Sequence, residues 1–134
     1  MKNTDYIQVT AAIIEKDGKI LIAKRNKEDP LKDKWEFPGG KLEPNETPEA
    51  CLKRELEEEL GVVTEIGEFI CSSKYEYSHI AIELHVFRAH YVSGEFKAND
   101  HAELKWVLPS ELSHYDFPEA DAPIVEKCIR HVEI

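Results

Sequence analysis

Three glutamates near the middle of the chain have the spacing of a metal-binding set. Glu55, Glu58 and Glu59 stand at positions i, i+3 and i+4, so on a helix their carboxylates share one face. Like charges this close repel one another, and a cation among them would relieve the repulsion. Ligands that offer only oxygen suit Mg²⁺ or Mn²⁺. The alternative interpretation is an acidic helix face in solvent, the usual fate of a run of glutamates.

The surrounding residues predict the helix that would hold these carboxylates. Thr47 can cap the first free N–H groups, Pro48 suits the first helical position, and Gly61 suits the end. Arg54 adjoins the acidic face, and a guanidinium paired with Glu46 would tie the preceding loop to the helix. Leucines at every fourth position predict an apolar stripe beside that face, at Leu52, Leu56 and Leu60.

The same residues occupy the defined positions of a known motif. Gly40 is followed after five residues by Glu46, after seven more by Arg54-Glu55-Leu56, and then by Glu58-Glu59 and Gly61-Val62. This spacing resembles the Nudix box, and the chain is similar to the MutT-like branch of the Nudix hydrolases. That family uses a divalent metal to cleave nucleoside diphosphates linked to another moiety. The chain resembles the CTP pyrophosphohydrolase branch more closely still, through EKDGKILIAKR and the Ala120-Asp121 pair.

The resemblance implies roles for individual residues. It assigns metal binding to the three glutamates and to the carbonyl of Gly39, and catalysis to Glu55 and Glu58. It also leaves Asp100 as a candidate proton acceptor, six positions before Trp106, where the family usually has Glu. The alternative for Asp100 is an ordinary turn residue. A structural role falls to four residues of the box: Gly40, Glu46, Arg54 and Gly61.

Six residues are assigned to substrate binding by the same resemblance: Arg25, Glu36, Phe37, Gly40, Lys41 and Asp121. Arg25 matches a phosphate-contacting arginine, and its alternative is a surface charge at a strand end. Phe37 has the core as its alternative. Asp121 stands where related enzymes hold a base-reading side chain; an ionised Asp accepts from the 4-amino group of cytosine and would repel guanine O6 unless protonated. The alternative for Asp121 is the N-cap of the last helix.

Composition bounds the class of protein. A chain of 134 residues predicts one domain, residues 1–134, and a net charge of −10 argues against a nucleic-acid polymer as partner. The resemblance implies a small nucleotide substrate, whose metal offsets the charge locally. Asp5 and Gln8 interrupt the N-terminal apolar run and no run has membrane-spanning length, so we expect a cytoplasmic protein without a membrane partner. We expect a monomer or a homodimer. Three cysteines predict reduced core thiols: Cys51, Cys71 and Cys128.

The order of the elements predicts an α+β fold with a mixed β-sheet between helices, which is the Nudix-type α/β/α sandwich that the resemblance implies. Asp17-Gly18 predicts a hairpin between two early strands, and residues 26–34 a loop. Two long strands at 64–77 and 79–92 are expected to bend or to carry a bulge. The six histidines lack metal-ligand spacing and are expected on the surface or on strand faces. A short strand, a helical turn and a last helix complete the chain, at 104–108, 109–112 and 122–132.

Together these inferences predict an enzyme. We expect an Mg²⁺-dependent (or Mn²⁺-dependent) nucleoside triphosphate pyrophosphohydrolase that releases a nucleoside monophosphate and pyrophosphate, acting on CTP, dCTP or modified cytosine triphosphates. An 8-oxo-dGTP diphosphatase of the MutT type is the main alternative. A dinucleoside polyphosphate hydrolase, which the resemblance links to tyrosines in the region of Tyr75 and Tyr77, is a weaker one. A non-catalytic nucleotide-binding Nudix domain often lacks a box glutamate, and this chain keeps all of them.

Overall fold

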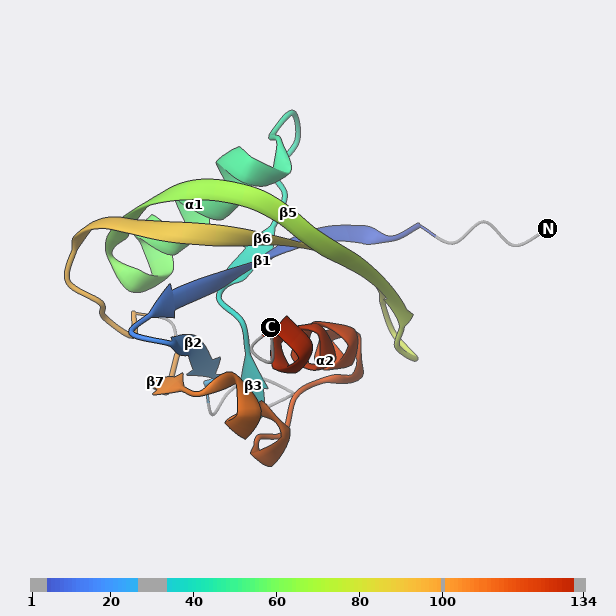
Figure 1. Ribbon diagram of the computed structural model, residues 1–134. Helices are drawn as coiled ribbons and strands as arrows, with labels where there is room; N and C mark the ends of the chain where they lie inside the picture. The colour runs from blue at the N-terminus through green and yellow to red at the C-terminus, as the bar shows by residue number, and fades with distance from the viewer. Residues whose placement is uncertain (1–4, 27–33, 100, 132–134) are drawn as a thin grey trace.

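A mixed β-sheet organises the chain (Figure 1). The structure, a computed structural model, describes residues 5–26, 34–99 and 101–131. The main path of the sheet is β3-β2-β1-β6-β5, with β4 pairing to β1 and β7 to β2. β1 and β6 run parallel and the other pairs are antiparallel. Within the described residues the strands are β1 (Ile7–Lys16), β2 (Lys19–Lys24), β3 (Trp35–Glu36), β4 (Gly39–Lys41), β5 (Val62–Glu76), β6 (Ala81–Gly94) and β7 (Glu103–Val107).

Two α-helices lie on opposite sides of this sheet, α1 (Pro48–Leu60) and α2 (Ala122–His131) (Figure 1). Successive residues of β1 alternate between them, because side chains of a strand point to opposite faces. Ala11 and Ile13 join the core that includes α2, whereas Ala12 and Ile14 join the core that includes α1. The predicted α/β/α sandwich with a mixed sheet is confirmed.

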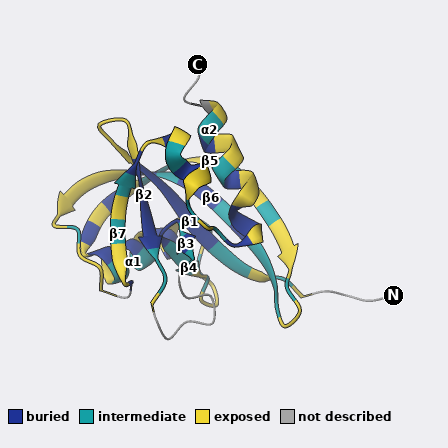
Figure 2. Cartoon of the chain, turned by 90° about the horizontal axis from the view of Figure 1, so that it is seen from below, coloured by how far each residue is buried: buried dark blue, intermediate teal, exposed yellow. Residues whose placement is uncertain are grey.

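The central strands are buried on both faces. Figure 2 shows the dark-blue buried residues concentrated on β1 and β2. The leucine stripe of α1 completes one of the two cores, and each leucine side chain taken out of water contributes about 1.5–3 kcal/mol. All three have an exposed fraction of 0%: Leu52, Leu56 and Leu60.

Turn chemistry fixes the hairpin between β1 and β2. Asp17 and Gly18 both have positive φ, 53° and 78°, as a two-residue hairpin turn of this kind requires. The turn pairs Lys16 with Lys19 across the strands. The Asp-Gly pair therefore occupies the turn that the sequence predicted.

The two long strands are irregular, also as predicted. β5 and β6 pair antiparallel from Val62 opposite Gly94 to Glu76 opposite Ala81. The register shifts three times along this pairing, between Val63 and Thr64, between Ile66 and Phe69, and between Phe69 and Cys71. Such bulges bend and twist a strand locally, which lets β5 curve over α1.

The end of the chain differs in detail from the prediction. A 3-10 helix, η1 (Pro109–His114), follows β7, and a second one, η2 (Glu119–Asp121), leads directly into α2. The three cysteines are free thiols, two of them buried. No helix within 5–26, 34–99 and 101–131 has the length and apolar character needed to cross a membrane. Most of the loop predicted at 26–34 lies outside the described residues.

Candidate active site

Helix α1 starts and ends where its capping residues stand. The Thr47 hydroxyl accepts a hydrogen bond from the Ala50 N–H at 3.2 Å, and Pro48 follows at the first helical position. At the other end Gly61 adopts a left-handed φ of 71°, and its N–H donates to the Glu57 carbonyl at 3.0 Å. These caps and the buried leucine stripe fix the rotation of the helix, and with it the face that carries the three glutamates.

Arg54 ties this helix to the loop before it. Its guanidinium donates from Nε to Glu46 Oε2 at 2.8 Å and from Nη2 to Glu46 Oε1 at 2.9 Å, a two-pronged pairing. The Glu43 N–H donates to the same carboxylate at 3.0 Å. The bonds from Arg54, and next that from Glu43, lower the pKa of Glu46 to about 2. The structure thus contains the loop-to-helix pairing that the sequence suggested.

Loss of this pairing is expected to show as a pH-dependent change in stability. Arg54→Ala should lower the melting temperature at pH 7, and Arg54→Lys should restore only part of it because lysine cannot form the two-pronged contact. A carboxyl with a depressed pKa stabilises the folded state above its unfolded pKa of about 4.5 and loses that effect as pH falls towards 2. Thermal unfolding between pH 7 and pH 2 should therefore show the wild type and Arg54→Ala converging in acid. A constant gap would contradict the assignment.

The candidate metal ligands lie beside the same arginine. Arg54 Nη1 contacts Glu55 Oε1 at 2.7 Å and Glu58 Oε2 at 3.2 Å. The Glu55 side chain is 16% exposed and that of Glu58 is 59% exposed, while one carboxylate oxygen of Glu59 is buried. Within the described part of the chain, no three His, Cys, Asp or Glu side chains are already gathered closely enough to hold a metal. In this structure the positive charge beside the acidic face comes from the guanidinium of Arg54.

Gly40 makes room for one of these carboxylates. A Cβ on Gly40 would overlap the carboxyl end of Glu55, whereas a Cβ on Gly39 would overlap the backbone of Thr10 on β1. The chemistry of these donors suits a hard divalent cation, since they are carboxylate oxygens on one helix face with a glycine backbone against them. The two adjacent glycines therefore differ in what they make room for: Gly40 for the Glu55 carboxylate, and Gly39 for the backbone of β1.

The contrast between the glycines gives a testable prediction. Gly40→Ala should lower kcat/KM by about tenfold to a hundredfold, because the added methyl group displaces the Glu55 carboxylate. Its melting temperature should change little, since the flexible end of a side chain can move aside. Gly39→Ala should instead lower the melting temperature, because β1 backbone cannot give way. Steady-state kinetics and thermal unfolding of both variants check this; equal effects from the two would contradict it.

A second polar cluster gathers residues from four separate segments. Arg25 follows β2, Glu36 lies on β3, His101 precedes β7 and Asp121 ends η2. Glu36 Oε1 contacts Arg25 Nη2 at 3.0 Å, and Glu36 Oε2 contacts His101 Nε2 at 2.6 Å. Glu36 and Arg25 also lie near enough to Asp121 to affect its pKa, so three of the predicted substrate-binding residues are neighbours in space.

Asp121 is the most buried acid of this cluster, with an exposed fraction of 8%. Burial, and next the nearby Glu36 carboxylate, raise its pKa to about 7, while Arg25 opposes the shift. An acid that is half protonated near neutral pH can both donate and accept hydrogen bonds. Asp121 ends η2 and directly precedes Ala122, the first residue of α2, so it also stands at the N-cap position of that helix.

The raised pKa of Asp121 has a consequence for stability. A carboxyl whose folded pKa exceeds its unfolded value near 3.8 stabilises the fold in acid and loses that effect as pH rises to about 7. The wild type should lose up to about 1.4 kcal/mol per pH unit over this window, a loss that Asp121→Asn should escape. The melting temperature of Asp121→Asn relative to wild type should therefore rise between pH 4 and pH 7 and then stay level. A difference in melting temperature between Asp121→Asn and the wild type that does not change with pH would contradict a raised pKa for Asp121.

His101 corrects the expectation that the histidines lie on the surface or on strand faces. Its side chain is 4% exposed and bonds to Glu36, a residue 65 positions away in the sequence. No local pattern around His101 predicts this contact, since the segment before β7 is mostly polar. The only sequence signal is the His itself next to the candidate residue Asp100.

The other predicted residues are distributed as follows. Phe37 is 4% exposed and stacks on Phe117 with ring centroids 5.2 Å apart, so its side chain is part of the core. Lys41 is exposed, and its carbonyl accepts from Arg54 Nη2 at 3.4 Å. Asp100, the candidate proton acceptor, lies outside the described residues. The predicted site thus divides into an acidic face on α1 and the polar cluster around Glu36.

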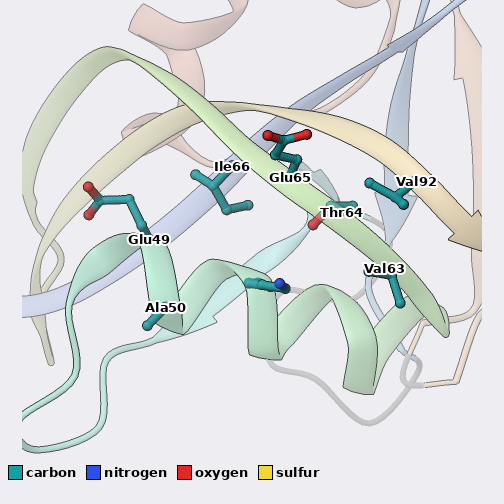
Figure 3. A pocket seen from close by; sticks show the side chains of 8 residues that line it. Glu49, Ala50, Val63, Thr64, Glu65, Ile66 and Val92 are labelled. Atoms are coloured by element: carbon teal, nitrogen blue, oxygen red, sulfur yellow. The ribbon is translucent and has the colours of Figure 1, made fainter.

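A separate hollow lies between α1 and the first part of β5 (Figure 3). Its volume is about 510 Å³, and its lining contains none of the predicted site residues. The buried Thr64 hydroxyl at its wall has no hydrogen-bond partner among the described residues. The side chains that line it come from α1, β5 and β6: Glu49, Ala50, Lys53, Val63, Thr64, Glu65, Ile66 and Val92.

Sequence comparison places the chain among proteins with this motif. Residues 9–127 match the model of the NUDIX domain family. The chain is 42% identical over 120 residues to the CTP pyrophosphohydrolase of Escherichia coli K12, covering 90% of this chain and 89% of that protein. It is 34% identical over 120 residues to the 8-oxo-dGTP diphosphatase of Buchnera aphidicola subsp. Schizaphis graminum, covering 90% and 91%.

Solved structures agree with the sequence relatives. The solution structure of the Escherichia coli ORF135 protein matches with a TM-score of 0.83 at 40% identity, covering 95% of this chain and 91% of that one. The crystal structure of the MutT protein from Methanosarcina mazei Go1 matches with a TM-score of 0.87 at 25% identity, covering 100% of both. With the box residues, the sandwich and the acidic face of α1 in place, the chain belongs to the Nudix family of hydrolases.

Proposed function

We propose that this Nudix hydrolase is an Mg²⁺-dependent nucleoside triphosphate pyrophosphohydrolase that converts CTP, dCTP or a modified cytosine triphosphate to the monophosphate and pyrophosphate. The observation that carries the proposal is the closeness of two carboxyl groups, Glu36 and Asp121, in one polar cluster. The identity of 42% to a CTP pyrophosphohydrolase supports the same substrate class. Three free thiols support a cytoplasmic location, where thiols stay reduced.

The acidic face of α1 supplies the metal-binding part of the proposal. Glu55, Glu58 and Glu59 would hold the cation, with the Gly39 carbonyl as a further oxygen ligand. A bound Mg²⁺ or Mn²⁺ offsets phosphate charge and makes water more acidic. The protein's own tasks are to hold these oxygens in place, through Arg54 and Gly40, and to accept a proton from the attacking water at a carboxylate, for which Glu55, Glu58 and Asp100 are the candidates.

The polar cluster supplies base recognition. Arg25 places a positive charge beside Glu36, whose carboxylate oxygens can accept hydrogen bonds from a base. Cytosine offers a 4-amino group to such an acceptor, whereas uracil presents a carbonyl oxygen there. An ionised carboxylate facing that oxygen would be left unpaired, which costs about 1–3 kcal/mol. The cluster therefore favours cytosine over uracil.

The raised pKa of Asp121 supports 8-oxo-dGTP as the second candidate substrate. A protonated Asp121 can donate to the O6 of a guanine, which an ionised carboxylate would repel. Since this pKa is about 7, acid conditions favour guanine recognition and alkaline conditions favour cytosine recognition. The ratio of CTP to 8-oxo-dGTP turnover should therefore rise between pH 6 and pH 8.

A substrate screen tests the proposal. Purified protein with Mg²⁺ is offered CTP, dCTP, 5-substituted cytosine triphosphates, UTP, 8-oxo-dGTP, ADP-ribose and a dinucleoside tetraphosphate, and pyrophosphate is measured separately from phosphate. Pyrophosphate from the cytosine nucleotides, with at least about tenfold lower kcat/KM for UTP, is the expected result. A preference for 8-oxo-dGTP at all pH values would replace the cytosine assignment. Tight nucleotide binding without any pyrophosphate release would show a binding domain instead of an enzyme.

A further inference from the structure

His101 is buried in the polar cluster although its neighbours in sequence are exposed or polar. Its Nε2 lies 2.6 Å from Glu36 Oε2, and its side chain is 4% exposed. The other ring nitrogen, Nδ1, is buried and has no hydrogen-bond partner among the described residues. A buried polar atom without a partner costs free energy, so a histidine at this position calls for a compensating task.

The two ring nitrogens define the tautomer. Glu36 is a carboxylate acceptor, so the proton of a neutral imidazole belongs on Nε2, where it donates to Oε2. The buried Nδ1 then carries a lone pair. In this arrangement the imidazole donates through Nε2 and holds the Glu36 carboxylate at Oε2.

Glu36 is held at both of its oxygens. Arg25 Nη2 contacts Oε1 at 3.0 Å, and His101 contacts Oε2 at 2.6 Å. A carboxylate has about four acceptor positions, so two contacts leave acceptor capacity for a ligand. The Glu36 side chain retains 23% exposure for such a contact. Two fixed oxygens allow it a single orientation, which is what discrimination between base edges requires.

We propose that His101 is a positioning residue for substrate selection, which holds the Glu36 carboxylate in the orientation that reads the base. This inference rests on the proposed function, in which Glu36 and Asp121 face the base. It assigns His101 no contact with the reacting phosphate groups. Its loss should therefore affect affinity and base preference more than the chemical step.

Kinetics with matched variants test the role. His101→Phe fills the ring volume without a donor, and His101→Gln keeps an N–H group near the place of Nε2. With CTP and UTP as substrates, His101→Phe should raise the KM for CTP about tenfold. The ratio of kcat/KM for CTP to kcat/KM for UTP should fall by a similar factor, while kcat should change less than about threefold. His101→Gln should restore most of the ratio. A drop in kcat alone, or an unchanged ratio in His101→Phe, would overturn the proposal.

Two controls separate positioning from simple packing. His85 is a partly buried histidine whose Nε2 lies 2.6 Å from Gln8 Oε1, outside the polar cluster. His85→Phe should leave the CTP-over-UTP ratio unchanged. In the double variant of Glu36→Gln and His101→Phe, the loss of CTP preference should be smaller than the product of the two single losses, because both changes remove the same interaction. Independent, multiplicative losses would contradict the coupling.

A measurement on the free protein makes the result independent of activity. ¹⁵N NMR of the imidazole rings should show His101 protonated at Nε2, and Glu36→Gln should shift that signal while leaving His85 unchanged. The absence of a proton on Nε2, or no response to Glu36→Gln, would overturn the proposal even if His101→Phe fails to fold. If no nucleotide yields pyrophosphate but the NMR result holds, the proposed function fails and the His101–Glu36 contact stands. If pyrophosphate is released but the CTP-over-UTP ratio of kcat/KM is the same in His101→Phe as in the wild type, the inference fails and the proposed function stands.

Discussion

Glu58→Gln is expected to lower kcat by about a hundredfold or more while the protein stays folded. The change removes one negative charge from the proposed metal ligands and keeps the size of the side chain. Glu58 is 59% exposed and shares Arg54 Nη1 with Glu55, so its loss leaves the Arg54–Glu46 pairing intact. The melting temperature should therefore change little. Pyrophosphate release across a range of Mg²⁺ concentrations, together with thermal unfolding, measures both parts.

The matched control is Glu57→Gln, one residue earlier on the same helix. Glu57 is exposed, and it serves the fold through its backbone carbonyl, which accepts from Gly61. This variant should keep kcat near the wild-type value. Near-normal turnover of Glu58→Gln at all Mg²⁺ concentrations would remove Glu58 from the metal site. An equal loss in Glu57→Gln would mean that overall negative charge, and not one ligand, sets the rate.

The second large effect is expected at Asp121. Asp121→Asn should narrow the CTP-over-UTP ratio of kcat/KM by about tenfold or more, because an amide offers a donor as well as an acceptor to the base. It should also raise the relative turnover of 8-oxo-dGTP and remove the dependence of that turnover on pH around 7, since the titrating acid is gone. Steady-state kinetics with the three nucleotides from pH 6 to pH 8 measure all of this.

Asp116→Asn serves as the control, since Asp116 is an exposed acid that pairs with Lys34. It should alter neither the base ratio nor the pH dependence. If Asp121→Asn changed only the melting temperature, Asp121 would be a structural acid, and base recognition would have to be sought in Glu36 alone.

The helix and the hairpin were predictable because their signals are local. Thr47, Pro48 and Gly61 define the ends of α1 through the backbone groups of their immediate neighbours. Asp17-Gly18 likewise specifies its own turn. The Arg54–Glu46 pairing joins residues only eight positions apart, one on α1 and one on the loop directly before it. Such short-range features can be predicted from a single sequence.

The polar cluster was only partly predictable because its contacts are long-range. Asp121 could be identified as a candidate, but an acid before a helix equally suggests a cap, and its burial depends on packing against distant strands. His101 meets Glu36 only because β7 and β3 both pair with β2. The sheet topology therefore creates this contact, and the sequence around His101 or around Glu36 does not predict it.

The bends in β5 also bear on how the protein resists self-association. β5 is the last strand of the sheet path, and a straight outer strand of 15 residues would offer a long row of free backbone N–H and C=O groups to another chain. The register shifts between Val63 and Cys71 twist that row, so the free groups do not lie along one line. Glutamates and a lysine at intervals along the strand add charge that opposes stacking of copies. The same irregularity that curves the sheet over α1 therefore also works against fibre-like aggregation.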